Sequence, residues 1–226
     1  MRKIADEAKL LHYMELAILA YGKGVNRLFG FSMEQVDLSN QKEVLLALHK
    51  MYQKGIYTRE GDSLRISKEY DLILNRMKEA KTALVVEASS DELPMICCYP
   101  GDDILVSEIT ALQADTVRLS FVDKTAFGDY LMETGYLPEL MTEEPEQEKS
   151  SGWTKIADEA EEEEKIILSI KNMDADTGEC LETVSVTELL IGYRMIMKRQ
   201  EERFEWKYSP SGFNVMMSEL LGGQKK

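Results

Sequence analysis

The fold is decided by residues 82–122, which read TALVVEASSDELPMICCYPGDDILVSEITALQADTVRLSFV. Four short runs in this stretch are rich in β-branched and other apolar residues and alternate with a period of two, which is typical of β-strands. Ser-Ser-Asp, Pro-Gly-Asp-Asp and Gln-Ala-Asp separate these runs and are turn sequences. Because short turns join neighbouring strands in antiparallel pairs, the stretch predicts a consecutive antiparallel sheet.

Helical periodicity precedes the sheet. Asn40, with Glu43 three residues later, forms a variant of the capping box, and apolar residues follow at helical spacing until Gly55. A Gly-containing turn at 60–62 then predicts a hairpin. The expected order is a helix over 10–21 ended by Gly22, a helix from Asn40 to Gly55, a hairpin of 56–59 and 63–66, and a helix from Ser67 to about Lys81.

The C-terminal region predicts more strands and a final helix. Residues 188–203 alternate like a strand but also consist of good helix formers, and we favour the strand. The predicted elements are a short helix capped by Asp123 and ended by Gly135, strands over 164–173 and 180–186, a further strand over 204–208, and a helix from Ser209-Pro210 to Gly222.

Charge is distributed unevenly along the 226 residues, whose formal net charge is −14. Residues 142–164 carry ten acids and two lysines, so this block is expected to be a solvated linker rather than core; a lure for a basic partner is the alternative interpretation. The predicted organisation is an N-terminal half over 1–138, an acidic linker or mobile excursion over 139–164, and C-terminal strands and a helix over 165–226 that complete the same fold.

One hexapeptide occurs twice, as Lys3–Ala8 and as Lys155–Ala160. The order of strands followed by a helix also repeats, which is compatible with a pseudo-two-fold arrangement. The predicted fold class is therefore α+β, with a largely antiparallel central sheet, flanking helices and a winged-helix-like N-terminal segment.

Residues suited to catalysis or metal binding are sparse. The two histidines, His12 and His49, lie in predicted helices, and Cys97 and Cys98 lie in an apolar strand that would raise rather than lower a thiol pKa. No metal-ligand spacing or phosphate-binding loop is present, so no enzyme activity, metal site or cofactor is predicted. The early acids at Asp6 and Glu7, with no apolar run of membrane-spanning length, favour a cytoplasmic protein without a membrane contact.

Methionine is the unusual component, with 13 residues. Its flexible side chain suits irregular cores and also surfaces that accept different partners. If part of the C-terminal set is exposed, an apolar helix of another protein is its natural ligand. The candidate partner-binding residues are Met195, Met197, Phe204, Trp206 and Met216.

Residues 14–86 resemble the N-terminal region of the EspG family of type VII (ESX) secretion chaperones. The shared order is an apolar helix (MELAILAYG), a gap with Phe29 and Phe31, a helix ending in Gly (EVLLALHKMYQKG), a hairpin (IYTREGDSLRIS), a helix (EYDLILNRMKEA) and a strand (ALVVEA). The resemblance implies a pseudo-two-fold fold, no catalysis, a cytosolic location and a client that is a secreted helical hairpin heterodimer. The chain departs from the Ala-, Leu- and Arg-rich family composition, which leaves the client's identity open.

The competing interpretation is a winged-helix DNA-binding regulator, because a helix followed by a hairpin also describes a recognition helix and its wing. The helix ending at Gly55 offers only Lys42, Lys50 and Lys54 as cations, and the chain is acidic, so nucleic acid is not an expected partner. The sequence thus predicts a non-enzymatic chaperone or adaptor for a helical client destined for type VII secretion, and no residue pattern indicates its oligomeric state.

Overall fold

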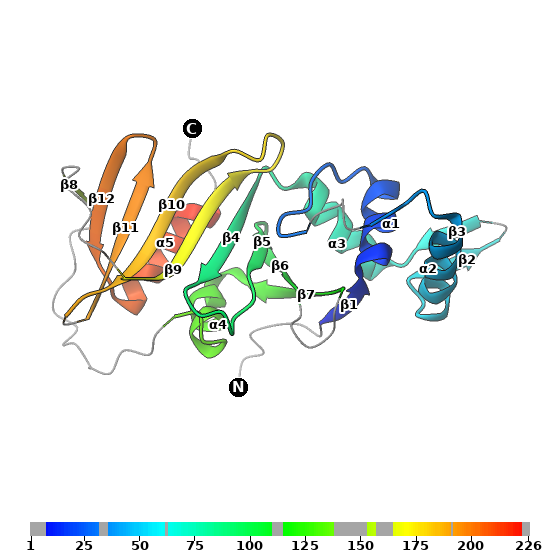
Figure 1. Cartoon of the computed structure of the whole chain (residues 1–226), viewed down its shortest axis with the longest axis horizontal. Coiled ribbons are helices and arrows are strands. Elements are labelled where there is room, and N and C mark those ends of the chain that lie inside the picture. The colour runs from blue at the N-terminus through cyan, green and yellow to red at the C-terminus, as the bar shows by residue number, and fades with distance from the viewer. Residues whose placement is uncertain are drawn as a thin grey trace.

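The computed structural model describes residues 8–31, 36–61, 63–109, 115–137, 153–156, 165–190 and 192–222. The molecule is elongated, and one large sheet occupies most of its length (Figure 1). The helices are α1 (Tyr13–Lys23), α2 (Gln41–Gln53), α3 (Lys68–Glu79), α4 (Phe127–Glu133) and α5 (Pro210–Gly222), with a 3-10 turn η2 (Lys124–Ala126) before α4. The predicted α+β class is confirmed.

Ten strands form a single antiparallel sheet in the order β1-β7-β6-β5-β4-β9-β10-β11-β12-β8, and β2 and β3 form a separate hairpin. The four runs predicted within 82–122 are β4 to β7, each paired with the next as expected. The strands are β1 (Lys9–His12), β2 (Tyr57–Glu60), β3 (Ser63–Ile66), β4 (Thr82–Ala88), β5 (Ile96–Tyr99), β6 (Asp103–Ile109), β7 (Thr116–Asp123), β8 (Thr154–Ile156), β9 (Lys165–Asp174), β10 (Cys180–Glu188), β11 (Tyr193–Arg199) and β12 (Glu202–Lys207).

The sheet consists of two topologically equivalent halves that meet where β4 pairs with β9. Reading outward from this pair gives β4, β5, β6, β7 and β1 in one half, and β9, β10, β11, β12 and β8 in the other. The outermost strand of each half precedes the others in the chain, and a helix, α4 or α5, follows the last. This order is the pseudo-two-fold arrangement that the sequence predicted.

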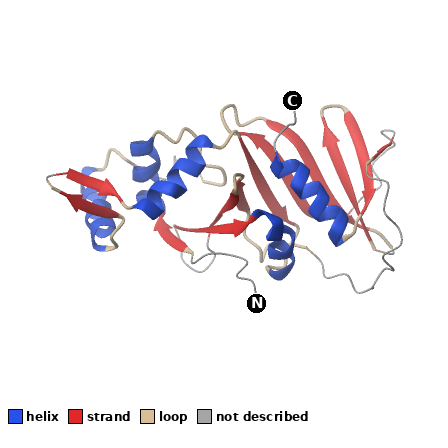
Figure 2. Ribbon diagram, turned by 180° about the vertical axis from the view of Figure 1, so that it is seen from behind, coloured by secondary structure: helices blue, strands red, loops and turns tan. Residues whose placement is uncertain are grey.

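Strand β5 has a continuous apolar sequence, and its surroundings in the N-terminal half of the sheet explain why. Ile96 and Cys98 face the core under α4 and α5, while Cys97 and Tyr99 face the core under α1 and α3. All four side chains are buried, because helices cover both faces of this half. Figure 2 shows α4 and α5 side by side on one face.

In the N-terminal half of the sheet, α1 and α3 cover one face. The same face of the C-terminal half is not covered by a described helix. There β10 and β11 carry Thr183, Ser185 and Lys198, and no helix of the described chain lies over them (Figure 1). Polar side chains alternate with core residues such as Val184 and Met197. The residue pattern therefore matches a sheet with helices on both faces in one half and on one face in the other.

The first helix differs from its prediction. Residues 9–12 form β1, whose Leu11 pairs with Val117 of β7, and α1 begins only at Tyr13. His12 caps α1, because its Nδ1 accepts from the Met14 N–H while Glu15 accepts the His12 backbone N–H. The helix ends at Gly24, with φ +71°, rather than at Gly22.

The structure also tests two further predictions, the strand favoured within 188–203 and the acidic linker. Within 188–203 the main element is the strand β11 (Tyr193–Arg199), as favoured, because β11 pairs with β12 across a tight turn that contains Gln200 at φ +54°. Within the predicted acidic linker, residues 154–156 form the edge strand β8. Most of that linker and most of both hexapeptide copies lie outside the described residues, so the proposed division of the chain stays a prediction.

Candidate protein-binding surface

The five candidate partner-binding residues lie together, in the core. Met195 and Met197 on β11 stand opposite Trp206 and Phe204 on β12, and Met216 reaches them from α5. Met195, Met197, Trp206 and Met216 have exposed fractions of 0, 8, 8 and 1%, so only the partly buried Phe204 reaches the surface. In this structure these residues hold the sheet against α5, and the four buried ones could touch a partner only if α5 moved away. Their binding role stays a prediction.

The strict alternation of β11 and β12 explains this placement. One set of side chains on each strand must face α5, which presents its own apolar stripe of Phe213, Met217 and Leu220. Trp206 also contacts Trp153 edge to face, with ring centroids 5.4 Å apart. Methionine fills the irregular space between helix and sheet here.

The exposed apolar residues with the most regular arrangement lie on α2. Leu45, Leu46 and Tyr52 have exposed fractions of 66, 53 and 52%. At 3.6 residues a turn, they share with His49 about a third of the helix circumference. We call Leu45, Leu46 and Tyr52 the α2 face. Exposed apolar side chains that share one face of a helix make that face a candidate contact site.

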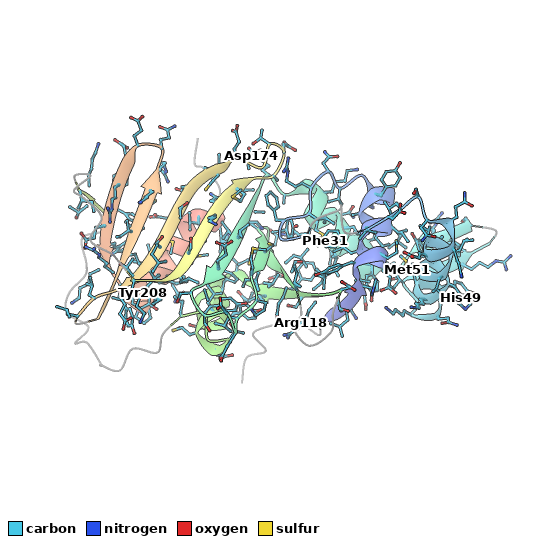
Figure 3. All side chains as sticks on the ribbon, viewed as in Figure 1. Phe31, His49, Met51, Arg118, Asp174 and Tyr208 are labelled. Atoms are coloured by element: carbon cyan, nitrogen blue, oxygen red, sulfur yellow. The ribbon has the colours of Figure 1, made fainter. Side chains whose placement is uncertain are left out.

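The opposite side of α2 attaches the helix to the body. Ala47 and Met51 are its buried residues, and Met51 is fully enclosed next to α1. Figure 3 shows Met51 toward α1 and His49 at the outer end of the molecule. Just beyond the helix, Lys54 donates to the buried carboxylate of Glu15 at 2.7 Å. The α2 face therefore points outward from a helix that is fixed on its other side.

Local sequence explains where α2 begins and ends. The Asn40 side chain accepts the Glu43 N–H at 3.4 Å, and Gly55 follows at φ +72°. The β2–β3 hairpin lies beside α2 at the same end of the molecule (Figure 1), and its Leu64 is 61% exposed.

A hollow of about 330 Å³ adjoins the α2 face, between α2, β1 and the start of α1. Leu46 and Ala47 form its apolar side, and Asp37, Glu43 and Asp115 contribute carboxylates. The hollow is large enough to receive a side chain from a partner that lies along α2.

Groups suited to chemistry do not converge in the described part of the chain. His12 is a helix cap and His49 is an exposed residue whose ring contacts Gln53. Burial raises the pKa of Cys97 to about 12 and that of Cys98 well above its ordinary value, as the sequence predicted. No three acidic, histidine or cysteine side chains among the described residues could hold a metal ion, and no described helix is long and apolar enough to cross a membrane.

The architecture defined by these observations is an α+β fold in which two equivalent halves share one antiparallel sheet and an apolar helix face lies exposed at one end. A solved structure with a similar fold is that of the Mycobacterium tuberculosis type VII secretion system chaperone EspG5 in complex with PE25-PPE41 dimer. The similarity covers 95% of this chain and 96% of that chain, with a TM-score of 0.56 and 7% sequence identity. The EspG-like fold expected from residues 14–86 is therefore confirmed. Comparison of the sequence with protein-family models and with curated proteins finds no match.

Proposed function

We propose that this protein is a non-enzymatic cytoplasmic chaperone that binds a helical client destined for type VII secretion and holds it through the α2 face. The observation that carries the proposal is the exposed apolar face of a helix that is anchored on its opposite side. An amphipathic helix of a client can bury its own apolar residues against Leu45, Leu46 and Tyr52. The similarity of fold to a chaperone whose structure was solved in complex with the PE25-PPE41 dimer supports the same role.

The winged-helix alternative is less well supported. In a DNA reader, the exposed face of the recognition helix carries side chains that form hydrogen bonds to base edges. On α2 that face is mainly apolar, and Lys54 is occupied by Glu15. A gel shift with random duplex at low salt should therefore show no binding, whereas a functional wing would produce a shift.

The direct test is co-expression of the tagged chain with each helical secreted protein or pair encoded beside its gene. We expect one client to co-purify as a complex of defined mass by light scattering, and to be soluble only in its presence. The double variant Leu45→Lys/Leu46→Lys should weaken the complex by roughly 30-fold or more, because charge replaces the buried centre of the contact.

Leu189 and Leu190 provide the matched control, since these exposed leucines lie in the turn after β10, far from α2. The double variant Leu189→Lys/Leu190→Lys replaces two neighbouring exposed leucines and adds two charges, as the α2 variant does, and should leave the complex intact. Both variants should retain the circular dichroism spectrum of the parent. Equal binding by the parent and the α2 variant would place the client elsewhere, and failure of every neighbouring protein to bind would contradict the chaperone role.

A further inference from the structure

A larger groove lies near the middle of the sheet, beside the start of β4 and the end of β9 and away from α2. It runs between α5 and the ends of β9, β10 and β11, with a volume of about 850 Å³. Val215, Ser218, Glu219 and Gly222 line it from α5 and recur at helical spacing, so they form one continuous stripe. The facing wall comes from the starts of β4 and β10 and from the ends of β9 and β11.

The polar side chains in this wall are connected. Arg199 donates from Nε and Nη2 to Oε2 of Glu182 at 3.0 and 2.6 Å, and Asn172 Nδ2 donates to Oε1 at 3.0 Å. Both oxygens of Glu182 are thus occupied. Asn172 is 7% exposed, and its Oδ1 has no hydrogen-bond partner in the described structure. Buried amide oxygens normally have a donor, and this one lies beneath the surface of the groove, out of reach of a partner that lies in it.

The remaining charge in the groove is negative. Glu182 and Arg199 compensate one another, whereas Glu219 has no salt bridge to any residue that the structure describes. The backbone carbonyls at the C-terminal end of α5 add partial negative charge. Lys124 Nζ donates to one of them, the carbonyl of Leu221, at 3.0 Å. A cationic group is therefore favoured beside Glu219.

An aliphatic contact lies next to this charge. Val215 is 50% exposed and Leu181 is 36% exposed, on opposite walls. Val215 precedes Glu219 by four residues, which places the apolar and the acidic side chain one helical turn apart on the same stripe. A helix that lies along α5 and carries an aliphatic and a basic residue at this spacing matches both.

We propose that this groove binds an amphipathic helix of a partner protein that presents an aliphatic residue and a lysine or arginine one turn apart. The aliphatic residue packs between Val215 and Leu181, and the cation pairs with Glu219. This second docking site does not rest on the role of the α2 face.

The test is a titration of the full ¹⁵N-labelled chain, followed by NMR, with an alanine-based helical peptide of about 18 residues, long enough to be helical. The probe carries leucine and lysine four residues apart, and a control peptide has glutamine for each lysine. We expect saturable shifts of the Asn172 side-chain amide and of the Val215 to Gly222 backbone amides, with tighter binding of the lysine peptide.

Variants of the groove measure the charged contact and the apolar contact with the peptide separately. Glu219→Gln should weaken the lysine peptide by about threefold, as for an exposed ion pair, and Val215→Gln by about fivefold through lost apolar contact. Glu133→Gln, which removes an exposed carboxylate at the end of α4, is the control for general attraction to an acidic protein and should have no effect.

Several outcomes would overturn the proposal. These are equal affinity for both peptides, absence of saturable shifts in the groove, an equal loss in Glu133→Gln, or tighter binding of a peptide with glutamate for lysine. A chain that ends at Gly222 tests the protein's own Lys225 and Lys226 as occupants. Unchanged affinity in that chain supports a partner, whereas a tenfold gain would mean that the tail competes for the groove.

Discussion

Replacing Lys54 with methionine should loosen the attachment of α2 to α1. The Glu15 carboxylate is 1% exposed, and Lys54 Nζ donates to both of its oxygens at 2.7 Å. Oε2 also accepts the backbone N–H of His12 at 2.9 Å. Glu15 lies in the first turn of α1 and Lys54 caps the end of α2. The pair therefore joins the helix that carries the α2 face to the body.

The magnitude follows from the burial of Glu15. Removing one partner of a buried ion pair costs about 3–5 kcal/mol, because the other charge is left uncompensated. The Lys54 side chain is 45% exposed, so water can reach the vacated position and reduce the cost. We expect Lys54→Met to cost about 2 kcal/mol. Glu15→Gln should cost about 1 kcal/mol, because the amide oxygen can still accept from His12.

The double variant Glu15→Gln/Lys54→Met distinguishes this mechanism from simple loss of two contacts. It leaves no buried charge, so it should cost about as much as Glu15→Gln alone, which corresponds to a coupling free energy of about 2 kcal/mol. The four chains form a double-mutant cycle, measured by urea unfolding. A loss of 2 kcal/mol should also lower the melting temperature by about 4–8 °C for a chain of this size.

Two spectroscopic signals locate the effect. Circular dichroism reports all helices, whereas Trp153 and Trp206 both lie in the C-terminal half and report there alone. If α2 detaches before global unfolding, ellipticity should fall at lower urea than the fluorescence changes. A double variant that loses as much stability as the two single variants together, which means strictly additive costs, would refute the reasoning.

Three further predictions concern the core. Burial raises the pKa of Cys97 and of Tyr130 to about 12, so above about pH 9 the folded state binds more protons than the unfolded state. Stability should therefore fall by at least about 3 kcal/mol between pH 9 and 11, because other buried groups such as Tyr208 have pKa values raised in the same direction. Unchanged urea midpoints at the two pH values would contradict this. An aromatic disulfide reagent should titrate one thiol, the exposed Cys180, in the folded chain and all three in denaturant, and reaction of more than one folded thiol would show that Cys97 or Cys98 is accessible. Gly30→Ala should cost about 2–3 kcal/mol of stability, because φ is +71° and the new Cβ would lie 2.7 Å from Cys97 Sγ. Gly55→Ala, at φ +72° with no atom within 4 Å of the new Cβ, should cost about 1 kcal/mol. Equal losses in thermal melts would show that the contact with Cys97 has no effect.

Local patterns were sufficient to predict most elements. The runs that became β4 to β7 alternate over short distances between turn sequences, and α2 has both a cap and a terminal glycine. Strand β1 could not be found in this way. Its four residues continue the helical pattern of α1, and they become a strand because they pair with β7, about a hundred residues later. Such non-local pairing overrides local propensity.

The candidate surface was less predictable, because methionine and tryptophan content does not distinguish core from surface. The alternation of β11 and β12 against the stripe of α5 is the signal that indicates burial. A signal for α2 was also present. Its apolar residues include Leu45, Leu46, Met51 and Tyr52, which spread over more of the circumference than one packing face requires.

The asymmetry between the two halves indicates where a binding function belongs. In the C-terminal half only eight residues, 157–164, connect β8 to β9, whereas the corresponding connection from β1 to β4 contains α1, α2, the hairpin and α3. The helices α1 and α3 are needed to cover apolar sheet residues such as Val85 and Leu105. The α2 face covers no other element in the part of the chain that the structure describes, and neither does Leu64 of the hairpin. Apolar surface that does not contribute to the fold of either half is best explained by contact with another molecule.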